Sequence, residues 1–341
     1  MSLPDLYFSA PSTAVPDTVL DNDATIGRVR EHFSGSPADW EVIEAGIRGI
    51  VTHCGTKVRY IEEDHSVSPG MFAASAVSDC LAAHGMTPAD VDLLVYGGIA
   101  RENFEPSTAA EVCGRLGMSP IHAVDVTCAC AGLIEALHTV AAQFALHEDL
   151  NVAVICAGEM FRDHIDYSIQ TPDELATKVA GLTLGNAAAA FVVSRTPLPG
   201  GSAHLLGIRH QTLAEHYRLC YAPINGHFTS HSRELFALAR HVPPEITALL
   251  NGVGWTPQEV DHYAFHQPSS AIITTLFDEL DAKPSARIYT HDLYANTAST
   301  AWALALQHRI THDGIAPGDK LVLMSAAAGF TIGTAAAEWV A

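Results

Sequence analysis

The stretch Asp125–Leu137, "DVTCACAGLIEAL", decides the fold and draws attention to two thiols. It places Cys128 and Cys130 between a short apolar strand pattern and a run of small and apolar residues without an internal helix breaker. The pattern predicts a strand, a turn and a helix that begins near Cys130. A thiol at a helix N-terminus has a lowered pKa, and Gly132 would let a substrate approach the backbone. One of these cysteines is therefore a candidate nucleophile, unless both only pack the helix start.

Short apolar patterns alternate with longer alanine-rich helical patterns on both sides of this stretch. Such alternation predicts mixed α/β layers with largely parallel, buried strands. The predicted strands are 91–98, 122–127, 151–160, 260–267, 287–292 and 320–330, and the predicted helices are 107–118, 130–146, 269–280 and 296–310.

The second half of the chain repeats the first half in outline. Residues 122–144 and 287–310 both run strand, turn and alanine-rich helix, so each half is expected to bring one helix start to a common centre. Proline and glycine cluster at 195–204, which predicts a boundary there. We expect an N-terminal half, 1–197, and a C-terminal half, 198–341. The polar and aperiodic segment 9–46 is interpreted as a flap or an insertion.

Charge and composition limit the classes of partner. The formal net charge is −20 and the chain has only 18 lysines and arginines, which argues against nucleic acid. No signal-peptide pattern opens the sequence, because Pro4, Asp5 and Pro11 interrupt it. No segment is expected to reach the length of about 18 apolar residues that spans a membrane. The sequence therefore predicts a cytoplasmic protein without a nucleic-acid or membrane partner.

The seven cysteines are interpreted as reduced thiols, and no metal site is predicted. Cys128 and Cys130 are too close in sequence for the usual Cys-x-x-Cys pair, and no second ligand pair follows. His262 and His266 have a spacing that could place them on one helix face, but the glutamate of a His-Glu-x-x-His motif is missing.

Two polar residues follow apolar strands in the second half. "AFHQPSS" places His266 at the end of a strand, and "LYANTAST" places Asn296 at the start of the helix that mirrors the Cys130 helix. A neutral imidazole and an amide at two helix starts could both donate hydrogen bonds to an enolate or oxyanion. The alternatives are a core histidine and an ordinary helix N-cap.

Taken in order, these residues resemble the thiolase superfamily of condensing enzymes, specifically the β-ketoacyl-acyl-carrier-protein synthase III group. The resemblance runs from "THCGTKVRYIEEDH" to "AAAGFTIGTAAAEWV". It implies that Cys130, which directly precedes Ala-Gly, is the nucleophile and Cys128 a packing neighbour, with His266 and Asn296 completing the catalytic set. It also implies an oxyanion hole from the amides of Cys130 and Ala328. Substrate contacts are implied for the residues Gly329, Phe330 and Ser269.

The resemblance implies a five-layer αβαβα thiolase fold with two similar halves, working as a homodimer. It further implies an acyltransferase without a permanently bound cofactor, whose substrates are thioesters of coenzyme A or acyl carrier protein. Cys130 would take an acyl group from the first thioester. A second thioester, such as malonyl, would then be converted to an enolate and condense with the acyl group in a Claisen reaction. Lipid or polyketide-type metabolism is the expected setting.

The segment 100–112, "ARENFEPSTAAEV", resembles the OleA-type branch, which joins two acyl thioesters head to head without decarboxylation. In that branch a glutamate matching Glu105 crosses the dimer interface and acts as the base. Removing an α-proton does require a suitable carboxylate. The alternative for Glu105 is a solvated acid beside Pro106.

Some positions differ from the synthase III pattern. Gly49 and His53 stand where a tryptophan and an arginine often contact coenzyme A, and Ser269 and Ala271 replace a common asparagine and arginine. We therefore expect a different mode of coenzyme A recognition. Two further readings remain: acyl transfer to a hydroxyl or amine with His266 as general base, and a non-catalytic subunit that pairs with an active homologue.

Overall fold

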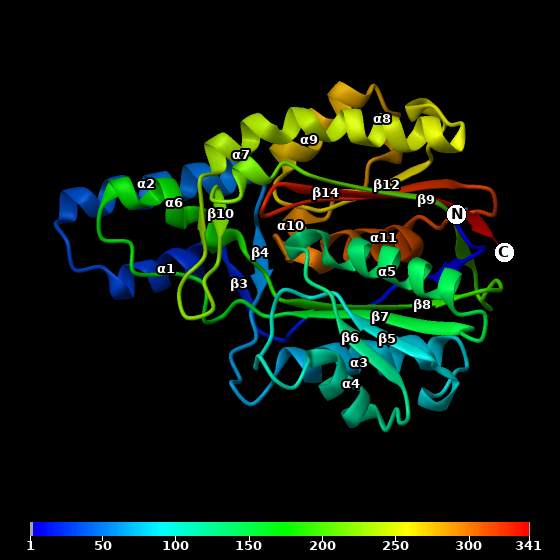
Figure 1. The fold of residues 1–341 in the computed structure, drawn as a ribbon. Helices are drawn as coiled ribbons and strands as arrows, with labels where there is room; N and C mark the ends of the chain where they lie inside the picture. Colours follow the sequence, from blue (N-terminus) through cyan, green and yellow to red (C-terminus); the bar gives the residue numbers. More distant parts are fainter. Residues whose placement is uncertain (1–2, 341) are drawn as a thin grey trace.

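The computed structural model describes residues 3–340 and arranges them in five layers (Figure 1). The helices α5 and α11 form the central layer, and a group of strands lies on each side of them. Helices α3 and α4 cover one group, and α8 and α9 cover the other. This is the predicted αβαβα fold. The helices are α3 (Pro69–Ala83), α4 (Thr108–Leu116), α5 (Gly132–Leu146), α8 (Val242–Val253), α9 (Ser270–Leu280) and α11 (Ala301–His312).

The strands of both halves are hydrogen-bonded into one path, β12-β13-β14-β9-β1-β8-β7-β5-β6, with β2 paired to β8. Pairing is parallel for β5 with β6, β5 with β7, and β12 with β13, and antiparallel elsewhere. The strands are β1 (Tyr7–Ser9), β2 (Ser12–Ala14), β5 (Leu93–Tyr96), β6 (His122–Asp125), β7 (Val152–Glu159), β8 (Ala187–Ser194), β9 (Ser202–Thr212), β12 (His262–Phe265), β13 (Lys320–Ala327) and β14 (Thr331–Val340).

Strand β1 joins the two halves. Its Tyr7 is paired with Ser194 of β8 on one side and with His204 of β9 on the other. The loop between β8 and β9 lies within the proline- and glycine-rich segment 195–204. The halves are therefore connected both by this loop and by the N-terminal strand.

Helix α5 supplies much of the core between the halves. Its Leu133, Leu137 and Val140 are fully buried with residues of α11 and both strand groups. The stretch Ala129–Leu146, which contains α5, is long and apolar enough to cross a membrane by length and composition. The prediction that no segment reaches this length was therefore wrong. Burial between two sheets requires the same apolar composition as a membrane span.

The internal repeat is visible in the structure, with one difference. In the first half β6 leads into α5, and in the second half α11 follows the segment that begins at Arg287. The predicted strand 287–292 does not form, because this segment makes only an isolated bridge between Tyr263 and Arg287. It then turns into the short helix α10 (His291–Tyr294).

A lateral lobe projects from the layered body at the side where the central helices begin (Figure 1). The segment 9–46, expected to be a flap or insertion, contributes regular helices to it. Asp21 caps α1 by accepting from the Ala24 amide at 2.7 Å, and α2 buries Ile43 and Ile47. The lobe region contains α1 (Asn22–His32), α2 (Pro37–Cys54), β3 (Val19–Asp21), β4 (Val58–Tyr60), α6 (Leu175–Lys178), β10 (Cys220–Tyr221), β11 (Thr229–Ser230) and α7 (Ser232–Leu238).

Candidate active site

Cys130 lies in the tight turn between β6 and α5. A single turn of 3-10 helix, Ala129–Ala131, precedes α5, and Ala129 has a left-handed backbone with φ 45°. This backbone is unfavourable for a residue with a side chain, and such strain is typical of functional turns. The predicted helix start near Cys130 is confirmed.

Gly132 has a different role from the predicted one. A Cβ atom there would collide with the carbonyl oxygen of Gly97, and a Cβ atom on Gly97 would lie 2.7 Å from the carbonyl oxygen of Gly132. The glycine therefore permits α5 to pack against the end of β5. Backbone packing, and not substrate approach, is what requires a glycine here.

The second half repeats this turn at the start of α11. A 3-10 helix, Ala298–Thr300, precedes α11, and Ala298 has φ 50°, close to that of Ala129. Ser299 therefore occupies the place in the second half that Cys130 occupies in the first. Asn296 lies just before this turn, and its backbone is held by hydrogen bonds with Thr183 and Gly185, both 2.9 Å long.

His266 and Asn296 are in direct contact. Nε2 of His266 lies 3.0 Å from Oδ1 of Asn296, and the same oxygen accepts the Ala298 amide at 3.0 Å. Because Oδ1 is thereby defined as an acceptor, Nε2 of His266 is the protonated, donating nitrogen. The Nδ2 group of Asn296 is left to donate elsewhere.

The imidazole of His266 is neutral at physiological pH. Burial lowers its pKa to about 4, although the hydrogen bonds with Asn296 and the Ala326 backbone act in the opposite direction. The prediction of a neutral imidazole at this position agrees with these surroundings.

The Cys130 thiol does not have the lowered pKa expected for a helix N-terminus. Burial in the mainly apolar end of the cavity raises its pKa well above the usual range, and the neighbouring Cys220 and Glu159 act in the same direction. The residue as a whole is half-buried and lines the cavity. The resting side chain is therefore a thiol, and its proton must leave during attack.

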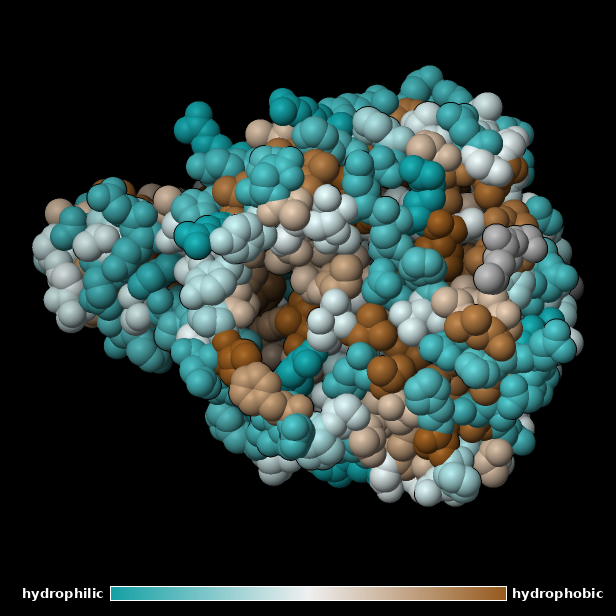
Figure 2. All heavy atoms as spheres, viewed as in Figure 1, coloured by the Kyte–Doolittle hydropathy of each residue, from teal (hydrophilic) through white to brown (hydrophobic). Residues whose placement is uncertain are grey.

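Cys130, His266 and Asn296 line one cavity of about 1200 Å³. The space-filling view shows the molecule hollowed between the lateral lobe and the body, with hydrophobic residues in the hollow (Figure 2). Most of the cavity wall is apolar. Its larger apolar residues include Ile50, Phe161, Leu175, Phe228, Leu276 and Met324.

The other residues expected in the site also reach this cavity, namely Ala328, Gly329, Phe330 and Ser269. Gly329 and Phe330 form a left-handed turn between β13 and β14, with φ 82° and 47°. Ser269 has a structural contact as well, since its hydroxyl caps α9 by accepting from the Ile272 amide at 3.3 Å. His53 lines the cavity, whereas Gly49 does not belong to its lining.

Glu105 lies outside the cavity of its own chain. It is exposed on the loop before α4, next to Phe104, whose exposure is 79%. The structure of one chain therefore brings Cys130, His266 and Asn296 together but keeps Glu105 apart from them.

Glu159, at the end of β7, was missed by sequence reasoning. It is fully buried and accepts hydrogen bonds from the amides of Ile99 and Ala100, at 3.0 and 3.2 Å, and from the Ser299 hydroxyl. Burial raises its pKa, and these hydrogen bonds act against the rise. Its only sequence signal is a carboxylate at the end of an apolar strand, which does not reveal partners from both halves.

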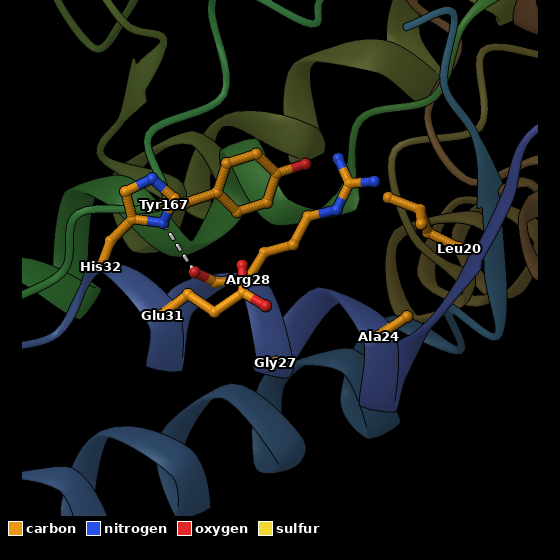
Figure 3. A pocket seen from close by; sticks show the side chains of 7 residues that line it. All are labelled: Leu20, Ala24, Gly27, Arg28, Glu31, His32 and Tyr167. Atoms are coloured by element: carbon orange, nitrogen blue, oxygen red, sulfur yellow. Dashed lines mark hydrogen bonds between the residues drawn. The ribbon is translucent and has the colours of Figure 1, made fainter.

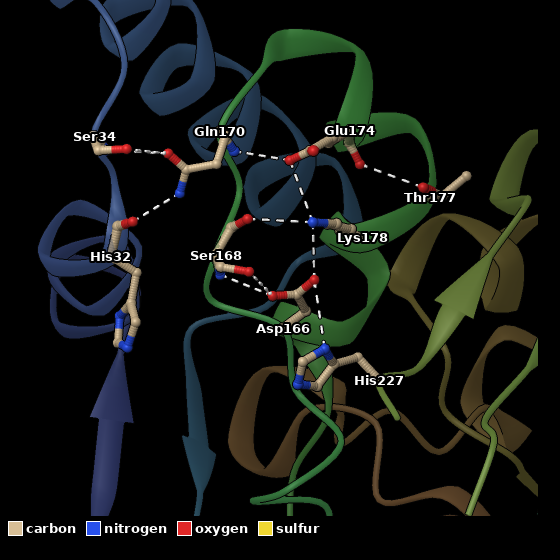
Figure 4. Close-up of polar contacts among 9 residues, drawn as sticks. All are labelled: His32, Ser34, Asp166, Ser168, Gln170, Glu174, Thr177, Lys178 and His227. Carbon is tan, nitrogen blue, oxygen red and sulfur yellow. Dashed lines mark hydrogen bonds and ion pairs between the residues drawn. The ribbon is translucent and has the colours of Figure 1, made fainter. Parts of the chain in front are cut away.

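One wall of the cavity is held in place by a polar network on the segment that follows β7 (Figure 4). Asp166 forms an ion pair with Lys178, with 2.9 Å between Oδ2 and Nζ, and accepts the Ser168 amide at 2.9 Å. Glu174 contacts the same lysine and accepts the Gln170 amide at 2.8 Å. These contacts fix the segment that carries the cavity residues from Leu175 onward.

A second cavity, of about 620 Å³, lies on the lateral lobe (Figure 3). Arg28 and Glu31 project from α1 at its edge, and the Arg28 guanidinium lies 5.7 Å from the centre of the Tyr167 ring. None of the predicted catalytic residues lines it. It is therefore separate from the reaction cavity.

Comparisons with known proteins find similar sequences and a similar fold. The family model for the C-terminal part of 3-oxoacyl-[acyl-carrier-protein] synthase III matches residues 250–339. The chain is 27% identical to β-ketoacyl-[acyl-carrier-protein] synthase III of Chelativorans sp. strain BNC1, covering 87% of this chain and 92% of that protein. It is 25% identical to an acyl-CoA:acyl-CoA alkyltransferase of Shewanella oneidensis, covering 83% and 86%.

A crystal structure of OleA from Xanthomonas campestris has the same fold, with a TM-score of 0.88 over 99% of both chains. Its sequence identity to this chain is 20%, so this similarity concerns the fold.

Proposed function

We propose that Cys130 carries the acyl group of a thioester Claisen condensation, because the chain has the thiolase fold and is similar in sequence to synthase III condensing enzymes. The observation that supports this most strongly is the convergence of Cys130, His266 and Asn296 on one apolar cavity.

In the first step, the Cys130 sulfur attacks the carbonyl carbon of an acyl thioester. A new carbon–sulfur bond forms, the bond to the donor's sulfur breaks, and the proton of Cys130 passes to the departing thiolate. The amides of Cys130 and Ala328 are proposed to stabilise the intermediate oxyanion. Both residues line the cavity, which supports this assignment.

In the second step, a second thioester binds with its carbonyl oxygen toward His266 and Asn296. The Nε2 hydrogen of His266, which donates to Asn296 Oδ1 in this structure, would turn toward the substrate oxygen, and the Nδ2 group of Asn296 is the second donor; both side chains remain uncharged at neutral pH. Two such donors stabilise an enolate oxygen as it gains charge. With a malonyl thioester, the bond between the α-carbon and the carboxylate breaks, carbon dioxide leaves, and its electron pair forms the enolate. The enolate carbon then attacks the acyl carbon on Cys130, the carbon–sulfur bond breaks, and the released cysteine thiolate takes up a proton.

The proposed substrates are acyl thioesters with a long hydrocarbon chain. Small-molecule cavities usually measure about 300–1,000 Å³, whereas this cavity measures about 1200 Å³ and its wall is mainly apolar. A long alkyl chain would fill such a space and bury apolar surface. In this proposal, either coenzyme A or acyl carrier protein can carry the acyl group to Cys130.

A second candidate is head-to-head condensation without decarboxylation, with Glu105 as base. The exposed Glu105 and Phe104 side chains favour it, since both stand on a loop free to enter a second copy of the chain. The similarity to an acyl-CoA:acyl-CoA alkyltransferase also favours it. In this case the base would come from the partner of a homodimer.

The test is intact-protein mass spectrometry of the wild type and of Cys130→Ala with a series of acyl-coenzyme A donors, followed by malonyl-coenzyme A. An adduct that Cys130→Ala lacks, discharged with release of carbon dioxide, supports decarboxylative condensation. Discharge by a second acyl thioester without carbon dioxide, lost in Glu105→Gln, supports the second candidate. If only a hydroxyl or amine compound removes the acyl group from Cys130, the reaction is simple acyl transfer and not condensation. A wild type that forms no adduct would contradict the proposal.

A further inference from the structure

A group of three potential metal ligands lies outside the reaction cavity, where α5 meets β9. Glu135 and His138 are one helical turn apart on α5, and His210 faces them from β9. The carboxylate of Glu135 lies 3.2 Å from Nε2 of His210 and 3.6 Å from Nδ1 of His138. Sequence analysis did not identify the group, because its third member comes from a distant strand.

The spacing of these atoms is close to that of ligands around one small cation, and a small rotation of His138 would complete it. All three donor atoms lie within 4.8 Å of one another. In a tetrahedral zinc site with bonds of about 2.0–2.1 Å, two ligand atoms are about 3.3 Å apart. The carboxylate is already at about this distance from both rings. A Glu-x-x-His pair on one helix face is also a known way to present two ligands to one metal.

The ring of His210 stacks on that of His138, with 5.2 Å between the ring centres, but its nitrogens lack hydrogen-bond partners in the described part of the chain. Both ring nitrogens are buried, and neither makes a hydrogen bond of good geometry with another described residue. A buried polar atom without a partner is costly, so a bound ligand would offset that cost.

We propose that Glu135, His138 and His210 bind one divalent transition-metal ion of the zinc type. Imidazole and carboxylate ligands suit such an ion, and three protein ligands leave a position for water. The site opens to solvent at His138, because 55% of the His138 side chain is exposed, whereas only 15% of the His210 side chain is exposed. The ion can therefore enter from the surface.

The metal would tie the two halves of the molecule together. Helix α5 belongs to the N-terminal half and carries the Cys130 turn at its start, whereas β9 opens the C-terminal half. Burial raises the pKa of the Cys128 thiol, and the charge of Glu135 acts in the same direction. A metal on Glu135 would thus fix the helix next to the nucleophile turn without entering the reaction cavity.

The test is isothermal titration calorimetry, in which ZnCl₂ is added to the metal-free full chain. The wild type is expected to bind one zinc ion per chain at this site. His138→Ala and Glu135→Gln are each expected to weaken that binding at least about tenfold. The His138 position is exposed, so its loss does not disturb the fold. A matched control is His312→Ala, because His308 and His312 form a stacked pair on α11, with ring centres 4.1 Å apart.

Cobalt in place of zinc distinguishes this site from the cysteines that line the reaction cavity. Nitrogen and oxygen ligands give visible cobalt bands without the strong near-ultraviolet band of a cobalt–thiolate bond. Three outcomes would overturn the proposal: no stoichiometric binding by the wild type, undiminished binding by His138→Ala, or loss of binding in His312→Ala. A cobalt–thiolate band as the main signal would place the metal on cysteines and would also overturn it.

Discussion

The Ser299 hydroxyl donates a hydrogen bond to Oε1 of Glu159, and this contact crosses between the two halves of the molecule. Ser299 stands at the start of α11 in the place that mirrors Cys130, and Glu159 ends β7 of the first half. The same carboxylate holds the amides of Ile99 and Ala100, which begin the loop that carries Glu105. One buried carboxylate therefore connects the start of α11 with the loop of the candidate base.

Removal of the Ser299 hydroxyl should destabilise the protein. In Ser299→Ala the buried Glu159 keeps its two amide donors but loses its side-chain donor, and we expect the free energy of unfolding to fall by about 1–3 kcal/mol. Denaturant unfolding measures this change. Ser285→Ala, at an exposed position of the same half, should change the same quantity by less than about 0.5 kcal/mol. Equal effects of the two substitutions would rule out a special role for the contact.

The reactivity of Cys130 should rise steadily with pH. Its pKa lies well above the usual range, so the thiolate fraction grows about tenfold per pH unit between pH 7 and 9. The rate of alkylation by iodoacetamide should follow this rise without a plateau. Peptide mass spectrometry is needed to follow Cys130 separately, because Cys54 and Cys220 line the same cavity. A plateau below pH 8 would show that the helix N-terminus outweighs burial.

Loss of either donor at the second-substrate position should separate the two half-reactions. His266→Ala and Asn296→Ala are expected to keep acylation of Cys130 but to slow condensation about 10²–10³-fold, the usual effect of removing one oxyanion donor. Because the pKa of His266 is about 4, the wild-type condensation rate should show no loss from imidazole protonation between pH 8 and 6. Acylation and product formation are measured by mass spectrometry, with the exposed His147→Ala as control. Loss of acylation in both variants would mean that they act on the first step.

The Asp166 network should stabilise the cavity wall in a pH-dependent manner. Burial tends to raise the pKa of Asp166, but hydrogen bonds from Ser168 and Lys178 outweigh it and lower the pKa to about 2. The depressed pKa contributes stability above the unfolded value of about 3.9, and this contribution is lost as pH falls toward 2. Asp166→Asn should therefore lower the melting temperature at pH 7 and about half as much at pH 3.

Thermal unfolding at both pH values measures this difference. The exposed Asp173→Asn on the same segment serves as the matched control. An equal loss of melting temperature at pH 7 and pH 3 would indicate that Asp166→Asn acts through packing and not through charge.

Much of the layered fold was predictable because its strands and helices are locally encoded. The alternation around Cys130 predicted β6, α5 and β7, and the second half followed the same pattern through β12, α9 and β13. The prediction of a strand at Arg287 was wrong, because an apolar and β-branched run predicts a strand regardless of its neighbours. Here it makes only one bridge, to Tyr263. Strand pairing depends on tertiary contacts that local sequence does not contain.

The candidate site was predictable only in part, for a similar reason. Cys130, His266 and Asn296 each stand at the junction of a strand or turn with a helix, which local patterns reveal. The raised pKa of Cys130 was not predictable, because it depends on burial and on Cys220 and Glu159, which approach from other parts of the chain. The helix-dipole argument considered one local effect and omitted these long-range ones.

The position of strand β1 has a consequence for the way the chain is synthesised. Strand β1 is synthesised long before β9, which begins at Ser202, yet one edge of β1 is paired only with β9. Until β9 has been made, the nascent N-terminal half presents an open strand edge, a surface prone to pairing with other chains. Synthesis of the second half therefore supplies β9, the strand that pairs with this edge. Correct folding depends on β9 being made before the edge pairs with another chain.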